Sequence, residues 1–380
     1  MPLTELHQTL TRLADAGDFS GVVLIDGPDG TLLERGYGLA SYTWQVPATP
    51  DIRYDTASIT KLFTAVAVLQ QVEAGAITLD TPVVDYLGLT GTAISPAATV
   101  HHMLCHTSGI GDDADEEAGE DYEAIYADRP NYSVRHTADL LEGFRDKPAN
   151  FAPGEGCRYC NASYVLLGLV VEQTSGQAYR DYVAEHVFGP AGMTDSGFFA
   201  MDRVVPRVAE AVEPVDGDDE GGSAQGAVLR RNIYAYPPIG SPDGGAHVTA
   251  RDLLTFHRAL LAGRLLRPET VALMTGQRAR HTDADGDVHW MGYGWESDTD
   301  DSGALRSYWK DGINVGASGA IRHYPGSGFT VVVLSNLTDG AWEPLSLLDT
   351  LVDELTADGA PAHEPVGGAQ DAAVAGPASR

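Results

Sequence analysis

Apolar residues along the chain fall into stretches of two different periods, and the first stretches predict a helix followed by two strands. Leucines recur at helical spacing over residues 6–13, and Gly17 follows as a helix stop. Two segments that read as strands come next, residues 21–25 and 31–35, with the turn-forming residues 27–30 between them. We therefore expect an amphipathic helix and then a β-hairpin.

A second helical pattern covers residues 58–73. Its apolar residues, from Leu62 to Val72, share one face, and Gly75 follows where a helix would end. Ser58 stands at the start of this segment. A helix N-terminus gathers unpaired amide donors and positive dipole potential, so the Ser58 hydroxyl would lie in a field that favours negative charge.

The remaining pattern places short helices in the middle of the chain and strands near its end. Between residues 80 and 240, short helical segments alternate with long polar loops, one of which carries the acidic run 112–117. A capping signal at residues 249–252 opens a helix that continues through Leu261. The later elements are expected as strands at 290–295, 307–310, 317–324 and 329–334 and as a helix at 342–355.

These elements indicate an α/β fold in which the late strands complete the sheet begun by the hairpin. Residues 1–85 and 241–358 would form one discontinuous α/β subdomain, and residues 86–240 a mostly helical subdomain inserted into it. A chain of 380 residues is long enough for two such units. Residues 359–380 are rich in Ala, Gly and Pro, which predicts a flexible tail.

Composition and charge exclude several classes of partner. The formal net charge of -30 would repel phosphate backbones, so nucleic acid is not expected as a partner. No apolar stretch approaches the ~20 residues that a membrane-spanning helix needs. The N-terminus lacks a secretory signal and the chain has only three cysteines, which together predict a cytoplasmic protein without a disulfide framework.

Lysine is rare in this chain, so each lysine is informative. Arginine supplies nearly all the positive charge, and the only lysines are Lys61, Lys147 and Lys310. A desolvated lysine can lose its proton near neutral pH, whereas an arginine cannot. Lys61 lies three residues after Ser58, so on a helix the amine and the hydroxyl share a face and can share a hydrogen bond. Such a lysine can remove the proton that keeps a serine hydroxyl a weak nucleophile.

Three motifs, in order along the chain, resemble those of the serine β-lactamase-related superfamily, especially its branch of class C β-lactamases, D-alanyl-D-alanine carboxypeptidases and esterases. Ser58-Ile-Thr-Lys61 matches the serine-lysine motif, Tyr159-Cys-Asn161 is similar to the Tyr-x-Asn element, and Lys310-Asp-Gly312 matches the Lys-x-Gly strand. Most of the chain takes part in the resemblance. It implies an α/β fold with an antiparallel sheet flanked by helices and a mostly helical subdomain inserted.

The resemblance also implies which residues carry out the chemistry. Ser58 would attack the acyl carbon and form a covalent acyl-enzyme, while Lys61 and Tyr159 exchange the protons. Tyr159 would protonate the leaving group. Its use as a base would require cationic neighbours, such as Lys61 and Lys310, to lower its pKa from about 10. No cofactor and no metal are implied.

The other matched positions would bind the substrate. Asn161 would hold the Lys61 amine and the substrate through the two sides of its amide. Lys310 would supply positive potential, and Gly312 would leave room for the substrate to lie beside the strand. The backbone amides of Ser58 and Ile313 would form the oxyanion hole.

Asp311 marks a departure from the Lys-Thr/Ser-Gly form of most β-lactamases and cell-wall peptidases. There the middle hydroxyl helps to receive the substrate's carboxylate, whereas an ionised aspartate cannot donate a hydrogen bond and would repel that carboxylate. We therefore expect the substrate to be a small neutral ester or amide. Strand alternation could instead turn Asp311 away from the substrate.

Other functions stay open at the level of sequence. The chain could be a β-lactamase or D-alanyl-D-alanine carboxypeptidase, an acyltransferase, or a binding or sensor protein that kept the fold and lost turnover. Residues 101–106 hold three histidines and a cysteine, all zinc-ligand types, but no His-Glu-x-x-His motif accompanies them. The natural acyl and leaving groups and the oligomeric state are not readable from the sequence.

Overall fold

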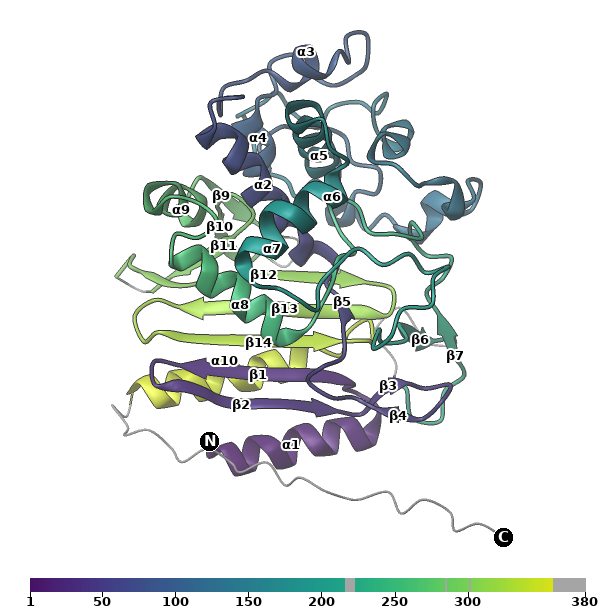
Figure 1. Cartoon of the computed structure of the whole chain (residues 1–380), viewed down its shortest axis with the longest axis vertical. Helices are drawn as coiled ribbons and strands as arrows, with labels where there is room; N and C mark the ends of the chain where they lie inside the picture. The colour runs from purple at the N-terminus through teal and green to yellow at the C-terminus, as the bar shows by residue number, and fades with distance from the viewer. Residues whose placement is uncertain (216–222, 284–285, 301, 358–380) are drawn as a thin grey trace.

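A large antiparallel sheet runs through the centre of the computed structural model, which describes residues 1–215, 223–283, 286–300 and 302–357 (Figure 1). The strand order is β2-β1-β14-β13-β12-β11-β10-β9. These strands are β1 Gly21–Gly27, β2 Gly30–Tyr37, β9 Ala279–Thr282, β10 Val288–Met291, β11 Glu296–Thr299, β12 Leu305–Asn314, β13 Ala317–Tyr324 and β14 Phe329–Ser335. The predicted hairpin and the late strands therefore form one sheet, as expected.

Smaller strands pair outside this sheet, and helices cover it on both faces. The small pairs are β3 Leu39–Ser41 with β4 Val46–Pro47, β5 Tyr54–Asp55 with β8 His247–Val248, and β6 Val212–Pro214 with β7 Leu229–Arg231. The helices are α1 Leu3–Ala16, α2 Lys61–Glu73, α3 Val83–Leu87, α4 Val100–Leu104, α5 Asn161–Ser175, α6 Tyr179–Val183, α7 Gly189–Ala191, α8 Ala250–Leu261, α9 Pro268–Thr275 and α10 Trp342–Ala357. Short 3-10 turns lie at Ala57–Thr60, Glu116–Ala118, Glu123–Tyr126, Asn131–Ser133 and Thr137–Gly143.

The two faces of β1 point into two separate cores. Val22 and Leu24 belong to the larger core, which also contains buried residues of α2, α5 and α8. Val23 and Ile25 belong to the smaller core, which is shared with α1 and α10. Successive side chains of a strand point to opposite faces, so a strand covered on both sides needs a continuous apolar run. This explains why residues 21–25 are apolar without alternation.

The helical region lies above the sheet in Figure 1 and includes α3 to α6. Helix α5 packs against α2, α3, α4 and α6. The predicted division into subdomains at residues 85/86 and 240/241 stays a prediction, and the predicted tail at 359–380 lies outside the described residues. Within the described ranges, no helix has the length and apolar character needed to cross a membrane.

Of the predicted strand 290–295, only residues 290–291 belong to a strand, β10, and residues 292–295 form the turn between β10 and β11. Its backbone closes where the Gly292 amide donates to the Trp295 carbonyl at 2.7 Å. Gly294 adopts a φ of 82°, and a Cβ there would lie 3.3 Å from the Lys61 carbonyl oxygen. The apolar residues of this segment are buried because the turn packs against the start of α2, which a periodicity argument cannot distinguish from a strand.

Candidate active site

Ser58 lies in a strained turn immediately before α2. The predicted helix 58–73 begins instead as the 3-10 turn Ala57–Thr60, and α2 starts at Lys61. Ala57 has a φ of 42°, which is unfavourable for a residue with a Cβ. The Ala57 amide donates to Asp55 Oδ1 at 2.8 Å, and the hydroxyl of Tyr236 donates to the other oxygen of Asp55. These contacts hold the turn so that Ser58 is partly exposed while its neighbours are buried.

The structure places Lys61 in direct contact with Ser58. The Lys61 ammonium donates to Ser58 Oγ at 2.9 Å, to Asn161 Oδ1 at 2.7 Å and to the Asp243 carbonyl at 2.7 Å. Lys61 is fully buried. Burial lowers the pKa of Lys61 to about 8, with Lys310 acting in the same direction and nearby carboxylates, Asp243 first among them, acting against it. Near pH 8 a large fraction of Lys61 is therefore neutral and can accept the Ser58 proton.

Tyr159 lies between the two buried lysines. Its ring centroid is 4.9 Å from Lys61 Nζ and 5.1 Å from Lys310 Nζ, and the His106 ring stacks on it at 4.5 Å. The Tyr159 hydroxyl is buried and has no hydrogen-bond partner among the described residues. Burial raises the pKa of Tyr159 well above 10, although the charge of Lys310 opposes this. Tyr159 is therefore protonated near neutral pH in this environment, and its expected role in proton transfer stays a prediction.

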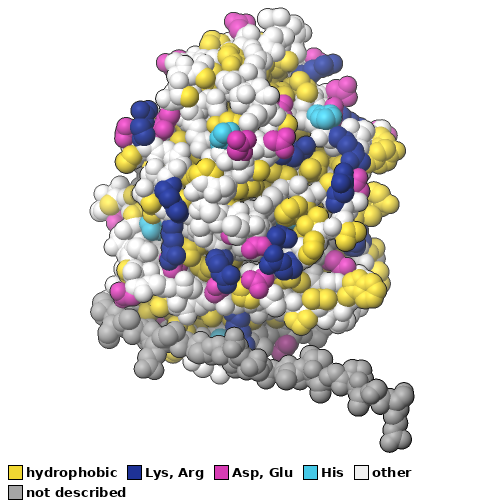
Figure 2. All heavy atoms as spheres, in the orientation of Figure 1, with side chains coloured by type: hydrophobic (Ala, Val, Ile, Leu, Met, Phe, Trp, Pro, Cys, Tyr) yellow, Lys and Arg dark blue, Asp and Glu magenta, His cyan; other side chains and the backbone are white. Residues whose placement is uncertain are grey.

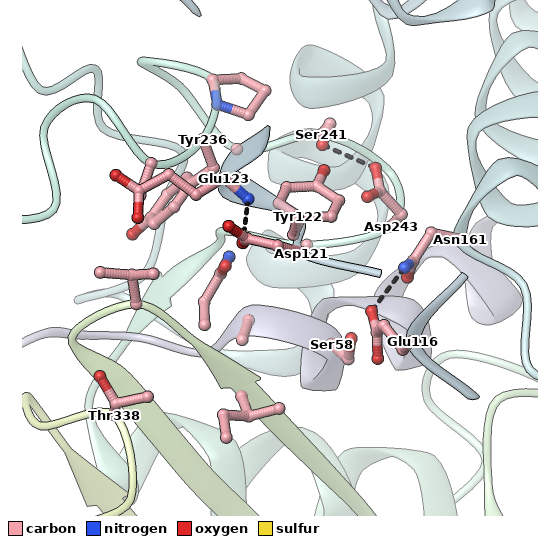
Figure 3. A pocket seen from close by; sticks show the side chains of 18 of the residues that line it. Ser58, Glu116, Asp121, Tyr122, Glu123, Asn161, Tyr236, Ser241, Asp243 and Thr338 are labelled. Atoms are coloured by element: carbon pink, nitrogen blue, oxygen red, sulfur yellow. Dashed lines mark hydrogen bonds between the residues drawn. The ribbon is translucent and has the colours of Figure 1, made fainter. Parts of the chain in front are cut away.

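Asn161 begins α5 and is oriented by two carboxylates. The Asn161 and Ala162 amides donate to Asp112 at 2.6 and 2.8 Å, which fixes the first turn of α5. The Asn161 side chain accepts from Lys61 through Oδ1 and donates through Nδ2 to Glu116 Oε1 at 2.7 Å. The expected contact with the Lys61 amine is therefore present, whereas the amide side expected to face substrate is held by Glu116 (Figure 3).

Lys310 is buried on β12, and its charge is neutralised within the protein. The Lys310 ammonium donates to Glu296 Oε1 at 2.6 Å and to Asp311 Oδ1 at 2.9 Å. The second oxygen of Glu296 lies 3.2 Å from His289 Nε2. Burial alone would lower the pKa of Lys310, but Asp311 and Glu296 outweigh it and raise that pKa well above its usual value. Lys310 is thus a permanent cation whose field is largely cancelled by its neighbours.

Asp311 lies beside Lys310, and Gly312 lies against the turn that carries Ser58. The Asp311 side chain is 44% exposed and curls back onto Lys310. A Cβ at Gly312 would lie 2.5 Å from the Thr56 carbonyl oxygen and 2.7 Å from the Ser58 nitrogen. Gly312 therefore lies directly against the turn that carries Ser58, where a side chain would collide with it. Its expected role of leaving room for the substrate stays a prediction. Ile313, the next residue, is exposed and lines the cavity above Ser58.

A cavity of about 360 Å³ opens above Ser58 (Figure 3). Its wall is formed by the segments around residues 116–123 and 235–244 and by the end of β12. The acidic side chains that line it are Glu116, Glu120, Asp121, Glu123 and Asp243, and no lysine or arginine of the described residues lines it. A cavity of this size accommodates a small organic molecule.

Several site residues were not identified from the sequence. Asp112 and Glu116 fall in the acidic run 112–117, which the sequence presented only as a polar loop, and Glu296 lay in no motif. Asp112 and Glu116 contact Asn161 across 49 and 45 residues of chain, and Glu296 contacts Lys310 across 14. No local spacing signals such contacts.

The histidines at positions 101, 102 and 106 are not arranged as a metal site. Among the described residues, no group of three or more His, Cys, Asp or Glu side chains is arranged to hold a metal ion. His106 Nδ1 accepts a hydrogen bond from the Cys160 amide at 3.0 Å, and its ring packs on Tyr159. Its role in the structure is therefore to support Tyr159.

Comparisons with known proteins agree with this geometry. The family model described as Beta-lactamase matches residues 6–353. The chain is 33% identical to esterase EstB of Burkholderia gladioli over 72% of this chain and 73% of that protein, and 27% identical to penicillin-binding protein 4 of Amycolatopsis lactamdurans over 88% and 86%. The solved penicillin binding protein from Bacillus halodurans has a TM-score of 0.81 at 33% identity, covering 90% of this chain and 99% of that one. The predicted α/β fold, an antiparallel sheet with helices, is confirmed by this likeness.

Proposed function

The chain belongs to the β-lactamase family of serine hydrolases, and we propose that it hydrolyses small esters or amides through an acyl-enzyme on Ser58. One observation carries this proposal. The Lys61 amine is fully buried, has a pKa lowered to about 8, and lies 2.9 Å from Ser58 Oγ. A nucleophile and a base in contact, with the base near its working pH, are the requirements of covalent acyl transfer.

In the first half of the reaction, Ser58 Oγ attacks the carbonyl carbon of the substrate while neutral Lys61 takes the hydroxyl proton. The oxyanion that results is stabilised by backbone amides of the Ser58 turn and of Ile313 on the adjoining strand. The bond to the leaving group then breaks, and the proton that Lys61 took from Ser58 passes to the departing alcohol or amine, directly or through the Tyr159 hydroxyl, so that Lys61 is neutral again and Tyr159 stays protonated. The acyl group remains bonded to Ser58 Oγ.

In the second half, water replaces the leaving group. Lys61, again neutral, takes a proton from the water as its oxygen attacks the acyl carbon. The bond to Ser58 Oγ breaks, the serine recovers its proton, and the acid is released. The overall change is one ester or amide plus one water giving one acid and one alcohol or amine.

Substrates without a carboxylate beside the scissile bond fit this site better than penicillins or peptides that end in D-alanine. A substrate carboxylate needs a free cation or a donor, and Lys310 already donates to Glu296 and Asp311. Asp311 itself is an additional negative charge at this position. The relative named an esterase supports an ester as substrate.

A labelling experiment tests the proposed chemistry. Wild-type protein incubated with a fluorophosphonate should gain one adduct by intact mass, and Ser58→Ala should gain none. Lys61→Arg should also fail to label and to turn over p-nitrophenyl butyrate, because arginine keeps the charge but cannot act as the base. Absence of labelling in the folded wild type would favour a sensor protein instead, and Lys61→Arg activity within tenfold of wild type would remove Lys61 from its role.

Substrate comparison tests the proposed class. The wild type should hydrolyse p-nitrophenyl butyrate much faster than nitrocefin, and Asp311→Thr should raise the nitrocefin rate, since it replaces a negative charge with a donor. A wild type that prefers nitrocefin, with neither rate changed by Asp311→Thr, would identify a β-lactamase. Product analysis with added alcohol acceptors decides between hydrolysis and acyl transfer.

A further inference from the structure

Two histidines face each other on the two strands at one edge of the large sheet. His281 on β9 stands directly opposite His289 on β10, and their rings meet edge to face with centroids 5.0 Å apart. His281 is buried and His289 is nearly so. Neither residue lines the cavity above Ser58, and the proposed reaction gives neither of them a role. Because burying polar groups costs free energy, such a pair calls for a reason beyond packing.

Each histidine of this pair contacts a glutamate of low exposure. His281 Nε2 lies 3.4 Å from Glu117 Oε1, and His289 Nε2 lies 3.2 Å from Glu296 Oε2. Burial alone would lower the pKa of His289, but its contact with Glu296 outweighs burial and raises that pKa. On the surface shown in Figure 2, acidic side chains and arginines are interspersed, and water screens pairs of that kind. The two glutamates here are only 20% and 10% exposed, so their contacts with the histidines are screened less.

Both glutamates lead to Tyr159. Glu117 Oε1 accepts a hydrogen bond from the Tyr159 backbone amide at 2.7 Å. Glu296 Oε1 accepts from Lys310 at 2.6 Å, and Lys310 Nζ lies 5.1 Å from the centroid of the Tyr159 ring. The histidine pair thus completes a closed chain of contacts that begins at the backbone of Tyr159 and returns to its ring.

The closed chain of contacts ties two loop segments to the sheet. Tyr159 stands in the irregular segment before α5, and Glu117 stands in the 3-10 turn Glu116–Ala118. Side chains on loops are placed less precisely than side chains on strands, which the ladder of hydrogen bonds holds. Arg158 also contacts Glu117, at 3.5 Å, but it belongs to the same segment as Tyr159. His281 is on a strand, so its contact with Glu117 connects these loops to the sheet.

We propose that His281 and His289 are positioning residues for Tyr159. By bridging Glu117 and Glu296, they hold its phenol in place beside the two buried lysines. The inference rests on the proposed acyl-enzyme function, in which the proton for the leaving group can pass through the Tyr159 hydroxyl. That hydroxyl has no hydrogen-bond partner among the described residues, so its place is set by what holds the ring and the backbone.

Asparagine and glutamine variants of each histidine test the contact with the glutamate. Glutamine can place its amide nitrogen near the position of histidine Nε2, whereas the shorter asparagine stops near that of Nδ1 and does not reach the glutamate. With ethyl butyrate, whose leaving alkoxide needs a proton, His281→Asn and His289→Asn should each lower kcat/KM by roughly 10- to 100-fold, the effect of a misplacement of up to ~1 Å. The loss should lie in kcat and not in KM, because neither histidine lines the cavity. His281→Gln and His289→Gln should recover most of it.

The leaving group provides a second readout. p-Nitrophenolate departs without a proton, so the asparagine variants should lose much less activity on p-nitrophenyl butyrate than on ethyl butyrate, which a pH-stat follows. His186→Asn is the control, since this partly exposed histidine also lies beside a glutamate, Glu185 at 3.8 Å, and does not line the cavity. It should leave both rates unchanged.

A double-mutant cycle shows whether the histidines act through Tyr159. In the Tyr159→Phe background, His281→Asn and His289→Asn should lower kcat/KM for ethyl butyrate by less than about threefold, because phenylalanine has no hydroxyl to position. An equal loss in both backgrounds overturns the inference, and so do glutamine variants as slow as the asparagine variants. The two histidines are changed separately, so a variant that does not fold leaves the other to decide.

The outcomes separate this inference from the proposed function. If the wild type is labelled by a fluorophosphonate and hydrolyses ethyl butyrate, but the folded asparagine variants keep full activity, the positioning role is overturned and the hydrolase stands. Failure of the folded wild type to label refutes the proposed function itself.

Discussion

Replacing Gly312 by alanine should displace the nucleophile. A Cβ on this residue would lie 2.5 Å from the Thr56 carbonyl oxygen and 2.7 Å from the Ser58 nitrogen, and both atoms belong to the backbone of the strained turn. Restoring a contact of 3.0–3.4 Å at Thr56 requires a shift of about 0.5–0.9 Å between β12 and that turn. Backbone atoms cannot rotate away as a side-chain end does, so the turn that carries Ser58 must move.

The size of the effect follows from that shift. A misplacement of ~1 Å between reacting groups can cost ~10²-fold in rate, so kcat/KM should fall by roughly 10- to 100-fold. Overpacking of this kind costs about 1–3 kcal/mol in the free energy of unfolding, and a chain of this size should still fold. The Lys61 to Ser58 hydrogen bond should lengthen, because Lys61 is anchored separately by Asn161 and the Asp243 carbonyl.

Two measurements on matched variants check the predicted effect of Gly312→Ala. The first is kcat/KM for p-nitrophenyl butyrate together with the rate of fluorophosphonate labelling, and the second is the free energy of unfolding in urea. Gly326→Ala is the control, because a Cβ there meets nothing within 4 Å. If Gly312→Ala keeps activity within threefold of wild type at unchanged stability, the close approach of β12 to the Ser58 turn does not position the nucleophile.

Three further predictions follow from the buried charges around Ser58. Tyr159→Phe should lower kcat by roughly 10²–10⁴-fold with little change in the unfolding free energy, and near-normal turnover with normal stability would make Tyr159 a packing residue. The pH profile of kcat/KM should rise through about pH 8 and then level off, because Lys61 must lose its proton to act as a base; a profile that falls over this range would contradict the assignment. Glu296→Gln should cost about 3 kcal/mol in urea unfolding, because it removes the buried partner of Lys310, and a loss below about 1 kcal/mol would show that Asp311 alone neutralises that lysine.

Features that depend on residues close together in the chain could be predicted from the sequence. The three-residue spacing of Ser58 and Lys61 placed both side chains on the same side of a helical turn, and their contact in the structure follows from that spacing. The hairpin at residues 21–35 and the late strands were also recognisable, because their apolar runs and turn residues are contiguous. The roles given to the individual site residues, and a cytoplasmic location, stay predictions.

What could not be predicted depends on contacts between distant segments. Residues 292–295 continue the strand-like composition of residues 290–291, but they form the turn to β11 and pack on the start of α2. Glu116 looked like one member of an acidic surface run until the fold placed it against Asn161. Lys310 was expected to present positive charge, and only the register of β11 and β12 shows that Glu296 cancels it. The net charge around a site depends on which side chains the tertiary structure brings together, so a single sequence motif does not predict it.

The pairing of β1 with β14 affects how the chain folds during synthesis. The Ser335 hydroxyl donates to the Ser20 carbonyl, which lies 315 residues earlier, so the first hairpin must wait for almost the whole chain before its inner edge is covered. An uncovered strand edge of this kind is prone to aggregate, and contacts this distant in sequence form slowly. The nascent chain therefore carries Ser58 and Lys61 long before β12 exists to complete the site. A chain that terminates before β12 lacks Lys310, Gly312 and Ile313 and leaves the edge of β1 uncovered, so it should be inactive and prone to aggregate.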